Sequence, residues 1–139
     1  MNEIDNSLIL TENEFNDINS CFEQYINSKW YQFLYRHNIR KKYRHLGRMF
    51  AIRYNYAVDN VFTACMLMAE SPLNNEHNRY EKIKKSVREG NKINMEIVYY
   101  AIFMVHFSRY IDTKSIKSKK HASESYAKIN KQRIINNGL

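Results

Sequence analysis

The chain has 139 residues, a length suited to one domain, and 44% of them are hydrophobic, which excludes a wholly disordered protein. One Pro and three Gly are too few for the many turns of a β-sandwich or β-barrel, so the composition predicts an all-α fold, a single compact domain of four to five helices. The formal net charge of +8 predicts a polyanion or an acidic partner as ligand.

Acidic and basic residues are segregated along the chain. The first 28 residues contain six acidic residues and no Lys or Arg, so the remainder holds all 22 basic residues and only eight acidic ones. We expect residues 1–10 to form a flexible or partner-docked acidic arm, which either masks the basic surface or docks on a neighbouring copy. Residues 11–112 are expected to form the helical domain, and residues 113–139 a basic C-terminal helix or tail.

The start of the chain and its cysteines indicate the cellular compartment of the protein. The chain begins with acidic and polar residues rather than a cleavable signal, and Cys21 and Cys65 follow no metal-ligand spacing. These features predict an intracellular protein with reduced cysteines. Frequent Asn, Ile and Lys, which have AT-rich codons, point to the genome of a virus, phage or parasite. For a viral source, we expect a location in the host cytoplasm, the nucleus or the virion.

A first helix is predicted from about residue 12 to residue 26. Thr11 followed by Glu14 matches a capping box, and Leu10 is placed to act as the hydrophobic staple. Apolar residues then recur at spacings of three and four, which is typical of one buried helical face. The residues of this face are Phe15, Ile18, Phe22, Tyr25 and Ile26.

A second helical pattern extends from about residue 29 to residue 69, with its apolar residues within one sector. Because such a length is unusual for a globular helix, a break near His37 and Asn38 is the alternative. Gly47 is expected to mark a kink or a close helix contact, since Gly is unfavourable within a helix.

A third helix is predicted over about residues 76–89, after Ser71 as an N-cap and Pro72 at a first helical position. Gly90 stands where a helix-ending glycine belongs. Three residues of this helix are expected to face inward: Tyr80, Ile83 and Val87.

The central element is predicted at about residues 93–111, as a helix that is apolar nearly all round and packed at the centre of the domain. The run from Ile97 to Phe107 contains no charge, but it is shorter than the roughly 20 residues that a membrane-spanning helix needs. No membrane partner is therefore predicted. The β-branched and aromatic content of this run leaves a buried strand as the alternative.

The most informative feature is an Arg stripe, with arginine at every fourth position: Arg36, Arg40, Arg44 and Arg48. Like charges at this helical spacing repel, and no acidic residue lies between Glu23 and Asp59. Nucleic-acid phosphates would relieve the repulsion, because guanidinium groups bind phosphate oxygens in bidentate fashion. The alternatives are a solvated face, pairing with the acidic segment of the chain, or an anionic membrane. The predicted contacts are Arg36, Arg40, Lys41, Arg44, Arg48, Lys117, Lys119 and Lys120.

Tyrosine is abundant, with 11 in the chain, and five tyrosines intersperse the basic stretch. Exposed tyrosines would be stacking platforms for nucleic-acid bases. Most of the five fall on or near the apolar face, however, and these are expected to be core or rim residues. The five are Tyr31, Tyr35, Tyr43, Tyr54 and Tyr56.

Catalytic motifs are scarce in the sequence. Arg40 to His45 matches an R-x4-H pattern, which resembles the RNase signature of the all-helical HEPN family. The resemblance covers six residues and implies that Arg40 and His45 act on RNA. The sequence has no glycine-rich phosphate loop, nucleophile elbow or metal-ligand cluster, so no cofactor and no metal is predicted.

The preferred hypothesis is a non-enzymatic nucleic-acid-binding protein that contacts the phosphate backbone of DNA or RNA with weak sequence specificity. A viral or phage genome-associated structural protein is its concrete form, with self-association through the acidic arm. The alternative is a viral or phage interaction module or inhibitor that binds an acidic partner. A HEPN-like RNase is the third hypothesis.

Overall fold

The computed structural model describes residues 3–70, 77–129 and 134. Within these residues the chain folds into seven helices without a named strand, so the all-α prediction is confirmed although the helices outnumber the four to five expected. The helices are α1 (Asn6–Ile9), α2 (Glu12–Asn27), α3 (Phe33–Ala57), α4 (Val61–Glu70), α5 (His77–Arg88), α6 (Met95–Thr113) and α7 (Ile116–Ala127). The predicted cap at Ser71 and Pro72 lies outside the described residues.

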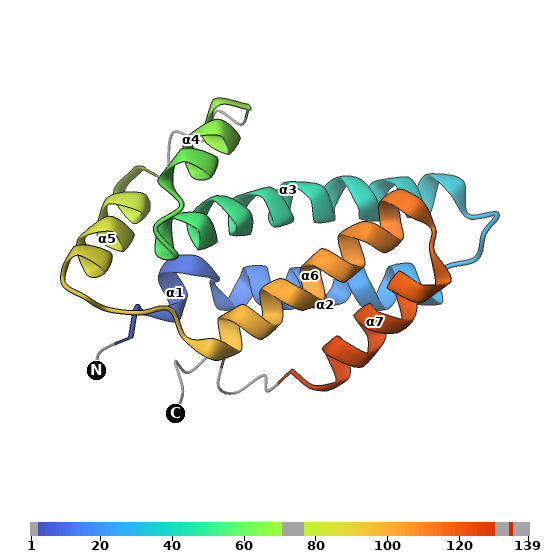
Figure 1. Cartoon of the computed structure of the whole chain (residues 1–139). Helices are drawn as coiled ribbons and strands as arrows, with labels where there is room; N and C mark the ends of the chain where they lie inside the picture. Colours follow the sequence, from blue (N-terminus) through green and yellow to red (C-terminus); the bar gives the residue numbers. More distant parts are fainter. Residues whose placement is uncertain (1–2, 71–76, 130–133, 135–139) are drawn as a thin grey trace.

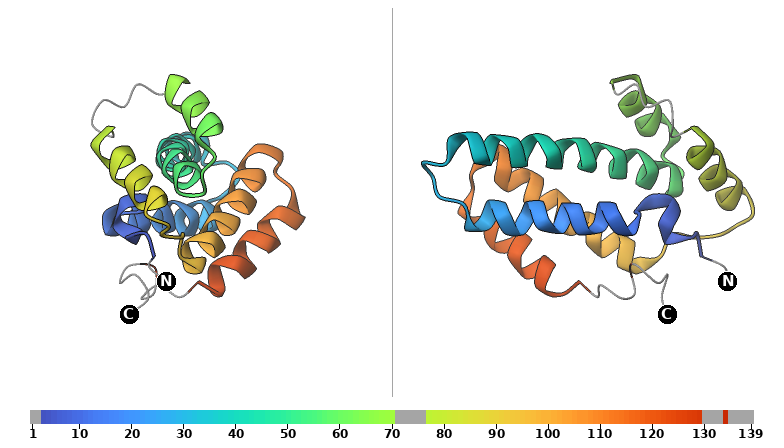
Figure 2. Two further views of the ribbon diagram at one scale, coloured as in Figure 1. Left: turned by 60° about the vertical axis from the view of Figure 1, so that its left-hand side comes forward. Right: turned by 180° about the vertical axis from the view of Figure 1, so that it is seen from behind.

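Two antiparallel helices, α2 and α3, lie side by side and are joined by a short loop that begins after Asn27 (Figure 1). The α6 helix crosses this pair, and α7 packs along α6 (Figure 2). The α4 and α5 helices lie near the C-terminal end of α3, away from the α2–α3 loop (Figure 1). The two ends of α3 therefore have different neighbours: the α2–α3 loop at its start, and α4 and α5 at its C-terminal end.

The start of α2 contains the capping box that the sequence predicts. The Glu14 N–H donates to Thr11 Oγ1 at 3.2 Å, and Glu14 Oε1 accepts from the Thr11 N–H at 3.0 Å. These reciprocal bonds satisfy two of the backbone donors that a helix start leaves without intrahelical partners. The Glu14 side chain is thereby held at the position from which it also reaches α3.

Residues 3–10, for which the sequence predicts a flexible or partner-docked acidic arm, lie against the domain in the structure. Ile4, Ile9 and Leu10 are buried, and the Ile4 N–H donates to the Lys92 C=O at 2.9 Å. Three buried aliphatic side chains are enough to hold so short a segment, because each contributes about 1.5–3 kcal/mol when fully buried. Hydrogen bonds and packing join residues 3–10 to α3 and to the segment before α6.

The second predicted helix is instead two helices, α3 and α4. The break lies at Asp59 and Asn60, well after the alternative break near residue 37. Asp59 has a φ of 62°, a left-handed conformation that Asp adopts more readily than most residues. Asn60 Oδ1 accepts from the Thr63 N–H at 3.4 Å and so caps the start of α4. The apolar periodicity continues across this break, which is why the sequence pattern hides it.

Two glycines are expected to respond in opposite ways to replacement by alanine. A Cβ added at Gly47 would lie 3.8 Å from Met104 Cε, so α3 has room for a methyl group there and Gly47 does not mark a close helix contact. Gly47→Ala should raise the free energy of unfolding by about 1 kcal/mol, because Ala favours helix. Gly90 has a φ of 84°, so Gly90→Ala should lower it by about 1–2 kcal/mol. Urea denaturation measures both changes, and a destabilised Gly47→Ala variant would contradict this packing.

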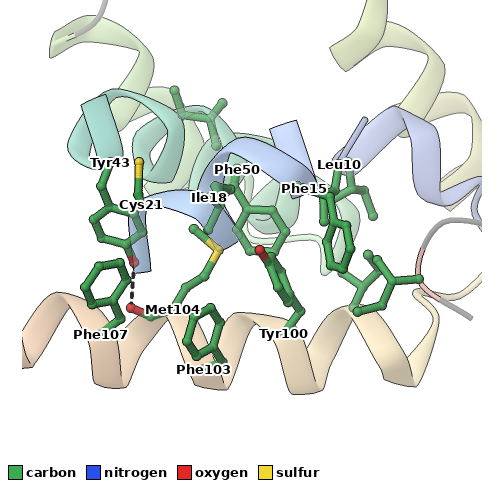
Figure 3. Close-up of a cluster of buried hydrophobic side chains, with 14 of the residues drawn as sticks. Leu10, Phe15, Ile18, Cys21, Tyr43, Phe50, Tyr100, Phe103, Met104 and Phe107 are labelled. Atoms are coloured by element: carbon green, nitrogen blue, oxygen red, sulfur yellow. Dashed lines mark hydrogen bonds between the residues drawn. The ribbon is translucent and has the colours of Figure 1, made fainter. Parts of the chain in front are cut away.

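The α6 helix forms the centre of the hydrophobic core. Figure 3 shows Tyr100, Phe103 and Phe107 pointing from α6 toward α2 and α3. Two buried tyrosine hydroxyls also fix the packing: the Tyr100 O–H donates to Asn19 Oδ1 at 2.7 Å, and the Tyr43 O–H donates to the Met104 C=O at 2.8 Å. Burial raises the pKa values of Tyr100 and Tyr43, so both hydroxyls stay protonated.

One face of α6 remains open to solvent, although the sequence predicts burial nearly all round. Met95, Tyr99, Ile102 and Val105 are 45–55% exposed. The core covers only the side of α6 that faces α2 and α3, and α7 covers only part of the rest (Figure 2). None of the described helices combines the length and the apolarity needed to cross a membrane.

The basic C-terminal segment is helical over residues 116–127. Within α7, Ala122 is buried, and the Tyr126 ring lies 4.8 Å from the Phe22 ring and 5.2 Å from the Phe103 ring, between centroids. The Tyr126 O–H donates to Glu23 Oε1 at 2.6 Å, which ties α7 to α2. This part of the segment is therefore a packed helix, one of the two forms that the sequence left open.

Candidate nucleic-acid interface

Three members of the Arg stripe line one open cleft of about 480 Å³, where the start of α3 meets the end of α6. They share it with two exposed aromatic side chains, from the α2–α3 loop and from the first residue of α3, and with residues at the end of α6 and directly after it. We call this site the Arg cleft. Its lining residues are Tyr25, Trp30, Phe33, Arg36, Arg40, Arg44, Ile111, Asp112 and Lys114.

The three arginines of the cleft differ in their surroundings. The Arg36 Cζ lies 4.5 Å from the centroid of the Tyr25 ring, and the buried Arg36 Nε has no hydrogen-bond partner within the described residues. Arg44 Nη2 lies 3.4 Å from Asp112 Oδ1, with both side chains at least 60% exposed, so this ion pair contributes little. Over the described ranges, Arg36 and Arg40 form no ion pair with a carboxylate.

Two acidic residues of α2, Glu14 and Asp17, pair with basic residues other than Arg36 and Arg40. Glu14 contacts the buried Arg53 at 2.7 Å, and Asp17 lies 3.8 Å from Lys42. The acidic segment therefore pairs with α3 at Arg53 and Lys42, but it does not pair with Arg36 or Arg40 within the described residues.

The aromatic residues of the cleft include two that the sequence analysis did not single out. Trp30 is 74% exposed and Phe33 is 70% exposed. In the sequence both are apolar residues that precede the periodic part of α3. The periodicity therefore does not place them on the buried or the exposed face of the helix. Of the five tyrosines, Tyr43 and Tyr56 are buried and Tyr31 is 60% exposed.

The other predicted contact residues lie outside the cleft. Lys41 is exposed on α3, and Arg48 lines a neighbouring groove between α3 and α6. Lys117, Lys119 and Lys120 are on α7, where Lys119 Nζ lies 5.9 Å from the Tyr110 ring centroid. Lys114, which directly follows α6, is the basic residue of the C-terminal segment that does line the cleft.

The R-x4-H pair is not assembled into one site. Five residues on a helix correspond to a rotation of about 140°, so Arg40 and His45 point in different directions from α3. Arg40 lines the cleft, and His45 is exposed outside it. The structure therefore gives the HEPN-like RNase hypothesis no support within one chain.

A histidine pair lies between α6 and α7. The His106 and His121 ring centroids are 5.1 Å apart, and partial burial, the neighbouring His121 and Arg109 all lower the pKa of His106. In the described part of the chain, no three His, Cys, Asp or Glu side chains lie close enough together to hold a metal ion.

The groove between α3 and α6 is larger than the Arg cleft, at about 760 Å³. Its floor is apolar and includes Phe50, Met104 and Ala101, with Leu67 of α4 at its side. Arg48 and Arg109 also line it. We call it the α3–α6 groove.

Comparison of the chain with models of protein families, with curated proteins and with solved structures found no match. The side chains of the Arg cleft therefore have to indicate its ligand. The lining residues carry three guanidinium groups and one ammonium group but one carboxylate, and exposed aromatic rings lie beside them. This combination suits an anion that also carries flat aromatic groups.

Asp112→Asn is expected to tighten the binding of a polyanion to the Arg cleft several-fold. Asp112 is the acidic residue among those that line the cleft, and its carboxylate lies beside Arg44. Its removal raises the local positive potential and releases the Arg44 guanidinium. Fluorescence anisotropy of a labelled oligonucleotide measures the change. Glu81→Gln on α5 is the matched control, because it alters the net charge equally at an exposed position outside the cleft.

Proposed function

We propose that this protein is a non-enzymatic nucleic-acid-binding protein that contacts the phosphate backbone through the Arg cleft. The observation that carries the proposal is that Arg36, Arg40 and Arg44 line one cleft, and that two of them have no carboxylate partner within the described residues. Like charges gathered in this way repel each other unless a ligand neutralises them.

Phosphate is the anion that best fits this arrangement. Guanidinium groups donate paired N–H bonds to phosphate oxygens, and successive phosphates along a strand can meet successive turns of α3. Arg36 and Arg40 are one helical turn apart, and Arg44 is one turn further. The cleft thus presents a row of donors rather than a single site.

Weak sequence specificity is expected from the composition of the cleft. Asn and Gln, which read adenine edges, are not among its lining residues. Contacts to phosphates fix the position of a nucleic acid without reading its sequence. The affinity should therefore vary little among sequences of the same length and strandedness.

The test is binding of labelled duplex DNA and single-stranded RNA to the full chain, with Arg40→Glu/Arg44→Glu as the variant. Arg40 is half-buried and Arg44 is exposed, so both substitutions should leave the fold intact. We expect the double variant to lose binding by at least about a hundredfold, since each hydrogen bond to a charged group is worth about 1.5–3 kcal/mol and two arginines are removed.

Lys82→Glu/Lys85→Glu is the matched control for this test. Both lysines are exposed on α5, far from the α2–α3 loop, and the change in net charge is identical (Figure 1). Equal loss of binding in the two double variants would mean that general charge rather than the Arg cleft attracts nucleic acid. Unchanged binding in Arg40→Glu/Arg44→Glu would overturn the proposal.

The α3–α6 groove favours a second candidate function, that of a module binding an acidic protein partner. Its apolar floor and its arginines would suit an amphipathic helix with acidic residues along its edges. A helical peptide of alternating Leu and Glu pairs is a suitable probe. Binding of this peptide that is abolished by Val105→Glu, together with no binding of nucleic acid, would favour the second candidate.

A further inference from the structure

We propose that the ligand of the Arg cleft is a single-stranded nucleic acid, with bases stacked on Trp30 and Phe33 and phosphates on Arg36 and Arg40. This inference rests on the proposed function and names the class of nucleic acid. It is drawn from the exposure of the aromatic side chains and from their place beside the arginines.

The α2–α3 loop presents its aromatic side chains to solvent. Trp30, Tyr31 and Phe33 are 60–74% exposed, although Trp and Phe are normally among the residues that a fold buries well. Exposed apolar residues that lie next to one another mark interaction sites. The loop therefore has the composition of a binding surface.

The loop holds these side chains in a defined position. The Lys29 N–H donates to Gln32 Oε1 at 2.6 Å, and the Gln32 N–H donates to the Lys29 C=O at 3.0 Å. Trp30 lies within this turn and Phe33 directly follows it, and their rings meet nearly edge to face, with centroids 6.4 Å apart and planes at 77°. An edge-to-face pair leaves ring faces available for other planar groups.

The aromatic rings distinguish a single strand from a duplex. Bases within a duplex are stacked on one another and present only their edges in the grooves. In a single strand the bases are free to stack on aromatic side chains, and such stacking tolerates any sequence. A duplex ligand would use the arginines alone and leave Trp30 and Phe33 exposed.

The dimensions of the cleft also suit a single strand. Its volume of about 480 Å³ lies within the range of roughly 300–1,000 Å³ that is typical of small-ligand sites. That volume fits a nucleotide unit with its base unstacked. Arg36 is positioned within it by the Tyr25 ring, at 4.5 Å, so its guanidinium is held in place before a phosphate binds.

Trp30 provides a direct readout, because it is the one tryptophan in the chain. We would titrate the full chain with single-stranded oligothymidylate and with a duplex of the same length, while recording both ligand anisotropy and Trp30 fluorescence. The expected result is quenching of Trp30 by the single strand and binding at least about tenfold tighter than to the duplex. Vesicles of phosphatidylserine and phosphatidylcholine form a third arm, since aromatic and basic residues also suit an anionic membrane surface.

Three variants make the test specific. Trp30→Ala should weaken single-strand binding about tenfold or more and leave duplex binding unchanged, and Trp30→Phe should restore most of the loss. Phe62→Ala is the matched control, because Phe62 is an aromatic residue 77% exposed on α4, at the other end of α3. It should change neither binding.

The outcomes separate this inference from the proposed function. Equal binding of single strand and duplex, without Trp30 quenching, would overturn the inference and leave the proposed function standing. Failure to bind either nucleic acid would overturn both. A blue shift of Trp30 emission with the vesicles, without binding of the single strand, would assign the loop to a lipid surface instead.

Discussion

Replacing Glu14 with alanine is expected to lower the free energy of unfolding by about 3–5 kcal/mol, because the change leaves a buried arginine without its carboxylate. Arg53 is 1% exposed, and its Nη1 lies 2.7 Å from both carboxylate oxygens of Glu14. The same substitution removes the capping bonds to Thr11. Urea denaturation of the variant measures the loss.

Glu12→Ala is the control for this prediction, since Glu12 is exposed in the same first turn of α2. It should change stability by less than about 0.5 kcal/mol. A Glu14→Ala variant as stable as Glu12→Ala would contradict the role of the Glu14–Arg53 pair in joining α2 to α3.

The Glu14–Arg53 pair also determines how stability should change with pH. Burial alone would raise the pKa of Glu14. The hydrogen bonds from Arg53 and Thr11, together with the charge of Arg53, outweigh burial and hold this pKa below its usual value of 4.5. The stability from Glu14 is therefore fully present above its unfolded pKa and is lost as the pH falls through the lower folded pKa. In acid, the Glu14→Ala variant should lose less additional stability than the wild type.

Replacing Phe103 with alanine is expected to cost about 3–5 kcal/mol of stability. Phe103 is fully buried, and its ring contacts the rings of Phe22, Tyr100, Phe107 and Tyr126. It therefore joins α2, α6 and α7 in one core. A large cavity between three helices cannot close by the movement of one side chain.

The neighbouring Ile102→Ala provides the control for Phe103→Ala. Ile102 is 45% exposed on the open face of α6, so its truncation should cost less than about 1 kcal/mol. Thermal unfolding of the two variants separates them. Similar losses would mean that Ile102 is covered in solution, and hence that another chain packs on the open face of α6.

The sequence predicted the elements that local signals determine. The capping box at Thr11 and the inward positions Tyr80 and Ile83 depend on residues within one or two turns, and the structure contains them. The break at Asp59 was missed, because apolar spacing continues across it and the cap at Asn60 is a weak signal within that pattern.

The Arg cleft could be predicted only in part. The spacing of Arg36, Arg40 and Arg44 places them on one helical face from sequence alone. Trp30 and Lys114 join them through tertiary packing, since the end of α6 meets the α2–α3 loop only in the folded chain. Sequence spacing carries no information about that contact.

The most direct measurement of the central claim is the salt dependence of oligonucleotide binding by the wild type and by Arg36→Gln/Arg40→Gln. Each neutralised phosphate of a single strand contributes about −0.7 to the slope of log K against log salt, so three arginines should give a slope of about −2. The double variant should be shallower by about 1.4, and Lys82→Gln/Lys85→Gln should match the wild type. A wild-type slope near zero, or one that the loss of Arg36 and Arg40 leaves unchanged, would contradict the assignment of the Arg cleft to nucleic acid.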